Sequence, residues 1–150
     1  MQETILVIFI ITIIIALGLF AFYKYNLNSI EKFKLEYEQL RAYTLLSTLP
    51  NHPQLQNSYL GNPENSIDTS KLLSLNLNNL GNKEIIIKQV YPKIEDKLCS
   101  LNNYPNCSSY LIYKKESSEK NINIISTPVS LYFPLTKEYR TGLLEIKWNY

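Results

Sequence analysis

Residues 5–22 read ILVIFIITIIIALGLFAF and contain no charged side chain. Fourteen of these eighteen residues are Ile, Leu, Val or Phe, and only Thr, Ala and Gly interrupt them. Each of the fourteen favours the centre of a bilayer by roughly 0.3 to 0.6 kcal/mol, so the run favours insertion by about 4 to 8 kcal/mol. A stretch this long and apolar on every face predicts a transmembrane helix over residues 4–23.

Two other structures produce apolar runs of this kind. A helix buried in a soluble core needs protein on every side, and the rest of this 150-residue chain is too short to surround one. A cleaved secretory signal normally has a basic start, a shorter apolar core and a small-x-small cleavage site. The chain starts with Met1, Gln2 and Glu3 and has no Lys or Arg before the run. We therefore expect a retained single-pass membrane anchor.

Residues 24–49 predict an amphipathic continuation of the same helix. Side chains at spacings of three and four lie along one helical face, and here they are Leu27, Ile30, Phe33, Tyr37, Leu40 and Thr44. Pro50 and Pro53 stop the helix near Leu49. The N-terminal helix then covers residues 1–49 and is roughly 70 Å long. We expect its outer stripe to pack on the domain formed by residues 50–150.

The part of the chain after the helix begins with a predicted loop. Residues 51–66 contain prolines, a glycine and several asparagines without a periodic apolar pattern. Asp68 is then suited to cap a short helix that ends near Gly81. The side chains of that helix expected to face the core are Leu72, Leu73 and Leu75.

Four strands are predicted between residues 84 and 148, at 84–91, 109–115, 122–133 and 141–148, because these runs are rich in β-branched and aromatic residues. Residues 133–139 resemble a hairpin loop between the last two strands. Pro128 inside its strand favours an edge or a bulge. Consecutive strands could form an antiparallel meander. The expected fold class is therefore α+β, with the long helix packed on a small antiparallel sheet.

Cys99 and Cys107 are the only cysteines, and a polar, turn-rich segment separates them. This spacing favours a local disulfide, which stabilises the fold by roughly 2 to 3 kcal/mol in the chain-entropy model. Free thiols and a metal site are the alternatives, although a zinc site lacks the CxxC spacing and the sole histidine, His52, is distant in sequence. Asn106, Cys107 and Ser108 also match the pattern for glycosylation of Asn106.

Two signals disagree about the side of the membrane on which the domain lies. A disulfide forms in oxidising compartments, so it predicts a domain outside the cytoplasm. The positive-inside rule favours the cytoplasm, since the basic residues Lys24, Lys32, Lys34 and Arg41 all follow the apolar run. Three of these four charges lie beyond the immediate flank among acidic residues. We therefore expect an extracytoplasmic domain, anchored at the cell surface or carried on a filament.

The combination of an apolar N-terminal helix, an acid at its start, an amphipathic outer half and a disulfide-containing β domain resembles the type IV pilin-like superfamily. Residues 1–6, MQETIL, are similar to the segment that follows the processing site in archaeal-type members. The resemblance implies a filament whose core is formed by these helices. It also implies that Glu3 pairs with the N-terminal amine of a neighbouring subunit. Glu3 is at the third position, whereas bacterial pilins have this acid at the fifth.

Simpler interpretations of these residues remain open. Glu3 can be a solvated acid that the helix dipole favours at a helix N-terminus. The small residues Ala16, Gly18 and Ala21 would let partner helices approach closely, but ordinary membrane anchors contain such residues too.

Composition and motifs exclude several classes of function. The 15 basic and 13 acidic residues leave a net charge of only +2, which argues against nucleic-acid binding. The sequence has no Gly-rich phosphate loop, nucleophile elbow or HExxH motif, so we expect no enzyme, no catalytic residues, no metal and no cofactor. The expected function is a structural subunit of a type IV pilus-like filament, whose partners are copies of itself and membrane lipid. The alternative is a monomeric anchored domain that binds an unknown surface receptor through its loops.

Overall fold

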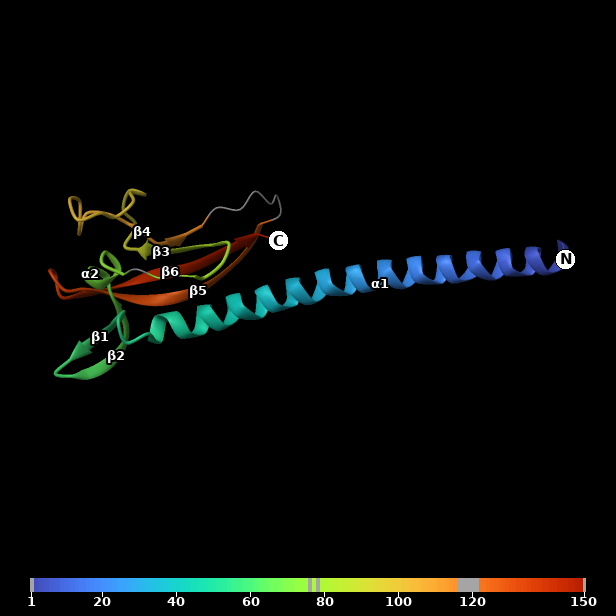
Figure 1. The fold of residues 1–150 in the computed structure, drawn as a ribbon. Coiled ribbons are helices and arrows are strands. Elements are labelled where there is room, and N and C mark those ends of the chain that lie inside the picture. Colours follow the sequence, from blue (N-terminus) through green and yellow to red (C-terminus); the bar gives the residue numbers. More distant parts are fainter. Residues whose placement is uncertain (1, 76, 78, 116–121, 150) are drawn as a thin grey trace. The chain divides into compact units, whose positions relative to one another are not determined.

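The computed structural model describes residues 2–75, 77, 79–115 and 122–149. The chain forms two compact units, Met1–Gln39 and Leu40–Tyr150. Helix α1, Gln2–Thr48, runs without a break through the first unit and into the second (Figure 1). A short 3-10 helix, η1, covers Leu49–Asn51 with a proline in its first turn, where the missing N–H of proline does no harm but prevents the α-helix from continuing. The predicted single long helix and its end near Leu49 are therefore confirmed.

The face of α1 that packs in the second unit differs from the predicted one. Ala42 and Leu49 are buried, and Leu45 and Leu46 pack against the same core cluster. Leu40 of the predicted stripe is 66% exposed. At about 100° per residue, Leu40 lies about 160° around the helix from Ala42. For Leu40 and Thr44, the stripe residues that belong to this unit, the expectation was wrong, because periodicity places residues on a common face but does not say which face is covered.

The segment predicted as a loop contains a β-hairpin. Strands β1, Gln56–Tyr59, and β2, Asn62–Asp68, pair antiparallel. Leu60 and Gly61 connect them with φ values of 51° and 84°, a turn of the kind that matches the twist of a hairpin. The loop prediction was wrong here because β2 begins with polar residues and a proline. The last residues of β2, which include Ile67, are buried in the folded domain, and this burial stabilises a strand that the local sequence pattern does not predict.

The short helix after β2 is capped as predicted but ends early. Asp68 accepts a hydrogen bond from the backbone N–H of Ser70 at 2.9 Å, and α2 covers only Thr69–Leu72. Leu72 is buried, and Leu73 and Leu75 pack against the core as expected. The helix does not extend to near Gly81.

The remaining strands are β3, Lys83–Tyr91; β4, Ser109–Lys114; β5, Ile122–Phe133; and β6, Glu138–Asn149. They continue the hairpin into one six-stranded sheet with the order β1-β2-β5-β6-β3-β4 (Figure 1). β2 pairs parallel with β5, so the sheet is mixed and the prediction of an antiparallel sheet was wrong. β6 lies between β3 and β5, which also excludes the meander. Alternation along a strand predicts its buried face but not its neighbour.

The two faces of the sheet differ in polarity. One face forms the core, where side chains of β3, β5 and β6 are fully buried: Ile85, Ile87, Leu131, Phe133, Leu144 and Ile146. On the other face, cross-strand ion pairs join Lys88 to Glu145 at 3.2 Å and Lys147 to Glu84 at 3.4 Å. These partly exposed pairs each contribute little stability, but they show which face is turned toward solvent. The α+β class is therefore confirmed, with a mixed sheet.

Candidate functional site

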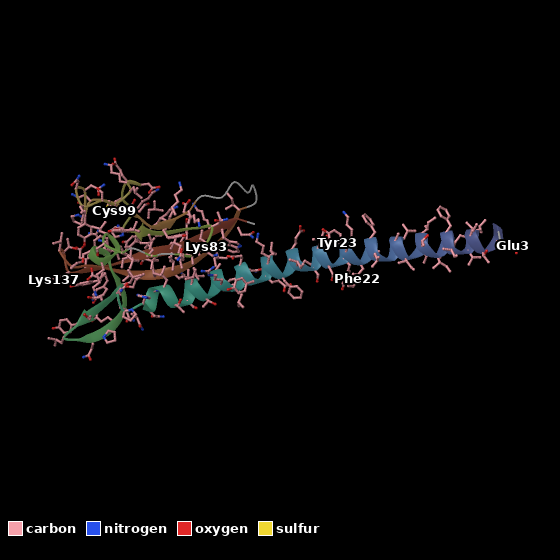
Figure 2. The ribbon with its side chains drawn as sticks, in the orientation of Figure 1. Glu3, Phe22, Tyr23, Lys83, Cys99 and Lys137 are labelled. Atoms are coloured by element: carbon pink, nitrogen blue, oxygen red, sulfur yellow. A yellow bond between two sulfur atoms is a disulfide. The ribbon has the colours of Figure 1, made fainter. Side chains whose placement is uncertain are left out.

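The large apolar side chains of the apolar run of α1 are exposed all around the helix. Its fourteen large apolar side chains, between positions 5 and 22, are each 43 to 67% exposed. Figure 2 shows side chains projecting on all sides of this stretch, which ends near the labelled Phe22 and Tyr23. An exposed apolar surface of this extent marks a contact with lipid or with another protein. The helix is long and apolar enough to cross a membrane, in agreement with the predicted anchor.

Glu3 lies in the first turn of α1 and is exposed, at the labelled end of the helix in Figure 2. The N-terminal turn of a helix carries unsatisfied N–H groups and a partial positive charge, which favour an acid at this place. The position suits a carboxylate that pairs with a cation of a second molecule. It suits a solvated acid equally well.

The three small residues of the apolar run do not share one face. At about 100° per residue, Gly18 and Ala21 lie about 60° apart, whereas Ala16 lies about 140° from Ala21. A Cβ atom added at Gly18 would meet no atom within 4 Å in the described part of the chain. Gly18 and Ala21 therefore share a surface on which a second helix could approach closely, and Ala16 lies largely on the opposite side.

Cys99 and Cys107 form the predicted disulfide, with their Cα atoms 5.1 Å apart. The loop that it closes is held internally by Asn103, whose side chain accepts from the N–H of Ser100 and donates to the carbonyl of Leu98, both at 2.8 Å. Figure 2 labels Cys99 in this loop. The disulfide indicates an oxidising, extracytoplasmic environment for the domain.

The disulfide loop is joined to the sheet at β4. The N–H of Cys99 donates to the carbonyl of Ser109 at 2.7 Å, and the N–H of Ser109 donates to the carbonyl of Lys97 at 3.1 Å. Leu98 thereby forms a parallel bridge with Ser109. The loop is therefore a fixed part of the domain at the start of β4.

Sequence reasoning missed a polar cluster in which Asp96 is bonded to Ser108 and Ser109 next to the disulfide loop. Ser109 Oγ donates to Asp96 Oδ1 at 2.6 Å, and Ser108 Oγ donates to the same oxygen at 3.3 Å. These hydrogen bonds lower the pKa of the Asp96 carboxyl below its ordinary value. No sequence motif links Asp96 to serines so far along the chain. The two hydroxyl groups tie Asp96 to the start of β4 and so help to hold this segment in place.

The glycosylation pattern is divided between an exposed and a buried residue. Asn106 is exposed, while Ser108, the third residue of the pattern, is 4% exposed and its hydroxyl is engaged with Asp96. The Asn106 side chain is accessible in the folded domain. Its modification stays a prediction.

Arg140 of β6 makes several side-chain contacts on the sheet. Its Cζ lies 4.2 Å from the ring centroid of Phe133, and its guanidinium donates to Gln89 Oε1 at 3.2 Å and to Glu138 Oε2 at 2.9 Å. The bond from Arg140 lowers the pKa of Glu138. Open hollows of about 360 Å³ lie beside it, one lined by Ser130, Tyr139 and Thr141. These contacts fix the Arg140 side chain as part of the packing of the sheet.

The described residues do not gather a set of potential metal ligands. Within that part of the chain, no group of three or more His, Cys, Asp or Glu residues is close enough to hold a metal ion. The features that stand out are an exposed apolar helix and a domain with a disulfide. No protein-family model, curated protein or solved structure matches this chain.

Proposed function

We propose that the protein is a structural subunit of a type IV pilus-like surface filament and assembles through its apolar N-terminal helix. The observation that carries the proposal is the continuous exposure of the fourteen large apolar side chains at positions 5 to 22. Such a surface is stable in lipid or against helices of equal polarity, and in water it would aggregate. A pool of subunits in the membrane and a filament core of packed helices provide those two environments.

Close packing supplies the attraction that lipid-like helices otherwise lack. A helix gains little by exchanging lipid for an equally apolar partner, so association depends on tight contact or on polar groups. The surface formed by Gly18 and Ala21 permits tight contact. Glu3 is the polar group, and in the proposed filament it pairs with the N-terminal amine of a neighbour, an attraction that a dry surrounding strengthens.

The domain of the proposed subunit faces the outside of the cell. The disulfide between Cys99 and Cys107 supports this side, because such bonds persist in oxidising compartments. Attached to the cell surface or displayed on a filament, the domain would expose its loops to the medium.

A second candidate function rests on the loops of the domain. Leu60 at the tip of the β1–β2 hairpin is 86% exposed, and Leu101 in the disulfide loop is 82% exposed. Apolar side chains at protruding tips suit a partner protein or envelope component. Under this alternative the protein is a monomeric membrane-anchored binding domain, and α1 serves only as its anchor.

The behaviour of Glu3 variants distinguishes the two proposed functions. Full-length Glu3→Ala and Glu3→Asp proteins are produced in the native host, and sheared surface material and membranes are analysed separately. The filament proposal expects homopolymer in the sheared material for the parent and Glu3→Asp, and its loss for Glu3→Ala, with all three inserted in membranes. Glu31→Ala, an exposed acid on the same helix, is the matched control and is expected to assemble. Absence of homopolymer for the parent protein contradicts the proposal and favours the anchored monomer.

A further inference from the structure

The strand β5 has an edge that no other described strand covers. β6 pairs with β5 along its entire length, from Ile122 to Phe133. On the opposite edge, β2 reaches β5 only at Leu131 and Tyr132. In the described residues, the outer edge of β5 from residue 122 to residue 128 is thus without a neighbour in the sheet (Figure 1). We refer to residues 122–128 on this side as the open edge.

Pro128 shows which backbone groups point outward from the open edge. It is paired with Leu143 of β6, and proline has no N–H to donate, so its nitrogen faces away from β6. Groups facing the partner strand alternate along an antiparallel ladder, and the β5–β6 register has no shift. The N–H and C=O groups of Ile124 and Ser126 therefore also point outward, toward a strand that the described part of one molecule does not supply.

The open edge has little of the protection that natural sheets give to exposed edges. Proteins shield such edges with charges, prolines, bulges or very short strands. The sequence of β5 contains no charged residue, and Ile122 and Ile124 are 60% and 59% exposed. By contrast, β1 has only four residues and a shift in register, and β4 has a shift in register and ends in Lys114. Only Pro128 interrupts the open edge.

We propose that the open edge pairs with strand β4 of a second copy of this chain, so that the sheet continues from subunit to subunit. The proposal rests on the proposed filament, in which all subunits point the same way. In copies of equal orientation only opposite edges of the sheet can meet. The edge that faces opposite to the open edge belongs to β4, because the order runs from β5 through β6 and β3 to β4.

The direction of β4 fits this pairing. β5 is antiparallel to β6, β6 to β3, and β3 to β4, so β4 runs antiparallel to β5 within one molecule. In an identically oriented neighbour, β4 is again antiparallel to the open edge. Antiparallel pairs are the commoner and slightly more stable kind of strand pairing. A pair of two open edges would instead need a twofold axis, which reverses one subunit and is incompatible with a polar filament.

The side chains of the two edges also fit. Leu111 of β4 is paired with Ile86, Ile86 with Glu145, and Glu145 with Ser126, so all four lie on the same face of the sheet. Ile122 and Ile124 lie on this face too, since they are four and two residues from Ser126. Leu111 is 40% exposed. In the proposed pair, Leu111 of one copy covers the exposed isoleucines of the next.

The available length of β4 is sufficient for a short ladder. Leu98 bridges the outer side of β4 at Ser109, and no described strand pairs with that side from Leu111 to Lys114. In the proposed pair, these residues of β4 lie opposite the part of the open edge that contains the exposed Ile122 and Ile124. Because the interface joins different surfaces of identical subunits, it can repeat from copy to copy, as growth of the proposed filament requires.

A crosslinking experiment tests the pairing. Full-length Leu111→Cys and Ile124→Cys chains are coexpressed in the native host, and intact cells are treated with a short bis-maleimide, because facing and diagonal Cβ atoms on one face of an antiparallel pair lie about 4.5 to 8 Å apart. We expect a crosslinked dimer only when both variants are present. Coexpressed Leu135→Cys and Ile124→Cys chains are the control, since Leu135, in the turn after β5, is a leucine even more exposed than Leu111. Crosslinking no stronger than in this control overturns the proposal.

A backbone variant provides a second, independent test. Ile124→Pro removes an N–H that points outward, and leaves the ladder with β6 intact, while Ile124→Val keeps that N–H. One lost hydrogen bond to a neighbour is expected to reduce filament yield about tenfold for the proline variant relative to the valine variant. Equal yields overturn the proposal. Fluorescence of the buried Trp148 checks that the domain folds in both the proline and the valine variant.

A Gly18→Cys chain separates this inference from the proposed function. Homodimer crosslinking at Gly18 without crosslinking between positions 111 and 124 supports helix assembly and overturns the sheet pairing. Crosslinking at neither place contradicts both. Crosslinking between positions 111 and 124 without contact at Gly18 supports the sheet pairing and contradicts assembly through the apolar helix.

Discussion

Gly142 of β6 and Leu131 of β5 are in such close contact that a Cβ atom at Gly142 would lie 2.7 Å from Leu131 Cδ1 and 3.0 Å from the carbonyl oxygen of Lys88. Leu131 is fully buried, so it has no free space into which to move. We expect Gly142→Ala to destabilise the domain by about 1 to 3 kcal/mol through overpacking. Urea unfolding of the detergent-solubilised chain measures the effect. Thr141→Ala, at the exposed neighbouring position, is the control, and equal stability of the two variants would contradict the close contact.

Two tyrosines of the core should respond differently to loss of their hydroxyl groups. Tyr104 OH donates to Thr69 Oγ1 at 2.9 Å, and Thr69 Oγ1 donates onward to the carbonyl of Tyr132. The hydroxyl of Tyr110 is buried and has no hydrogen-bond partner in the described residues. We expect Tyr104→Phe to lower the free energy of unfolding by about 1 kcal/mol, and Tyr110→Phe to leave it unchanged or raise it. Denaturant unfolding of both variants checks this, and a larger loss for Tyr110→Phe would show that its hydroxyl is bonded.

Protonation of Asp96 at low pH should weaken the hydrogen bonds that attach the disulfide loop to the sheet. Hydrogen bonds from Ser109 and Ser108 lower the pKa of this carboxyl in the folded state. A lowered folded pKa contributes stability that is present above the unfolded value of about 3.9 and is lost as the pH falls through the folded value. We therefore expect the parent protein to lose more stability than Ser109→Ala between pH 5 and pH 2, both measured by urea unfolding. Parallel pH profiles for the two proteins would show that these hydrogen bonds do not act on Asp96.

Reduction of the disulfide should affect the domain but not the anchor. Opening the bond between Cys99 and Cys107 frees a short loop, which is expected to lower the stability of the domain by about 2 to 3 kcal/mol. A Cys99→Ser, Cys107→Ser double variant should show the same loss in thermal unfolding. Extraction from membranes with carbonate should be the same as for the parent protein. Release of the double variant from the membrane would mean that the domain contributes to anchoring.

The elements predicted correctly from the sequence are those with strong local signals. The helix α1 has a long apolar run and a proline at its end, β3 and β5 are rich in β-branched residues, and Asp68 caps the helix that follows it. The hairpin of β1 and β2 was missed because its strands are polar and its turn begins with Leu60 instead of Asn or Asp. Its stability comes from burial of residues such as Leu55 and Ile67, which only the folded chain brings together.

The candidate site was predictable to the same extent. The cysteine pair was predicted from residue type and spacing and is bonded in the structure, whereas the roles of Glu3 and of the small residues of α1 stay predictions. The cluster at Asp96 and the open edge of β5 depend on which parts of the chain become neighbours in the sheet. Local sequence patterns do not predict strand order. The packed face of α1 was mispredicted for a related reason: both Leu40 and Leu45 fit a helical period, and the domain covers only Leu45.

The central place of β6 in the sheet has a consequence for biosynthesis. Because β6 separates β5 from β3, neither of those strands can complete its pairing before residue 149 has left the ribosome. At synthesis rates of 5 to 20 residues per second, the membrane segment emerges roughly 6 to 25 s earlier. The nascent chain is therefore tethered at the membrane while its strands still lack their partner, and a chaperone on the far side of the membrane would have that interval in which to act.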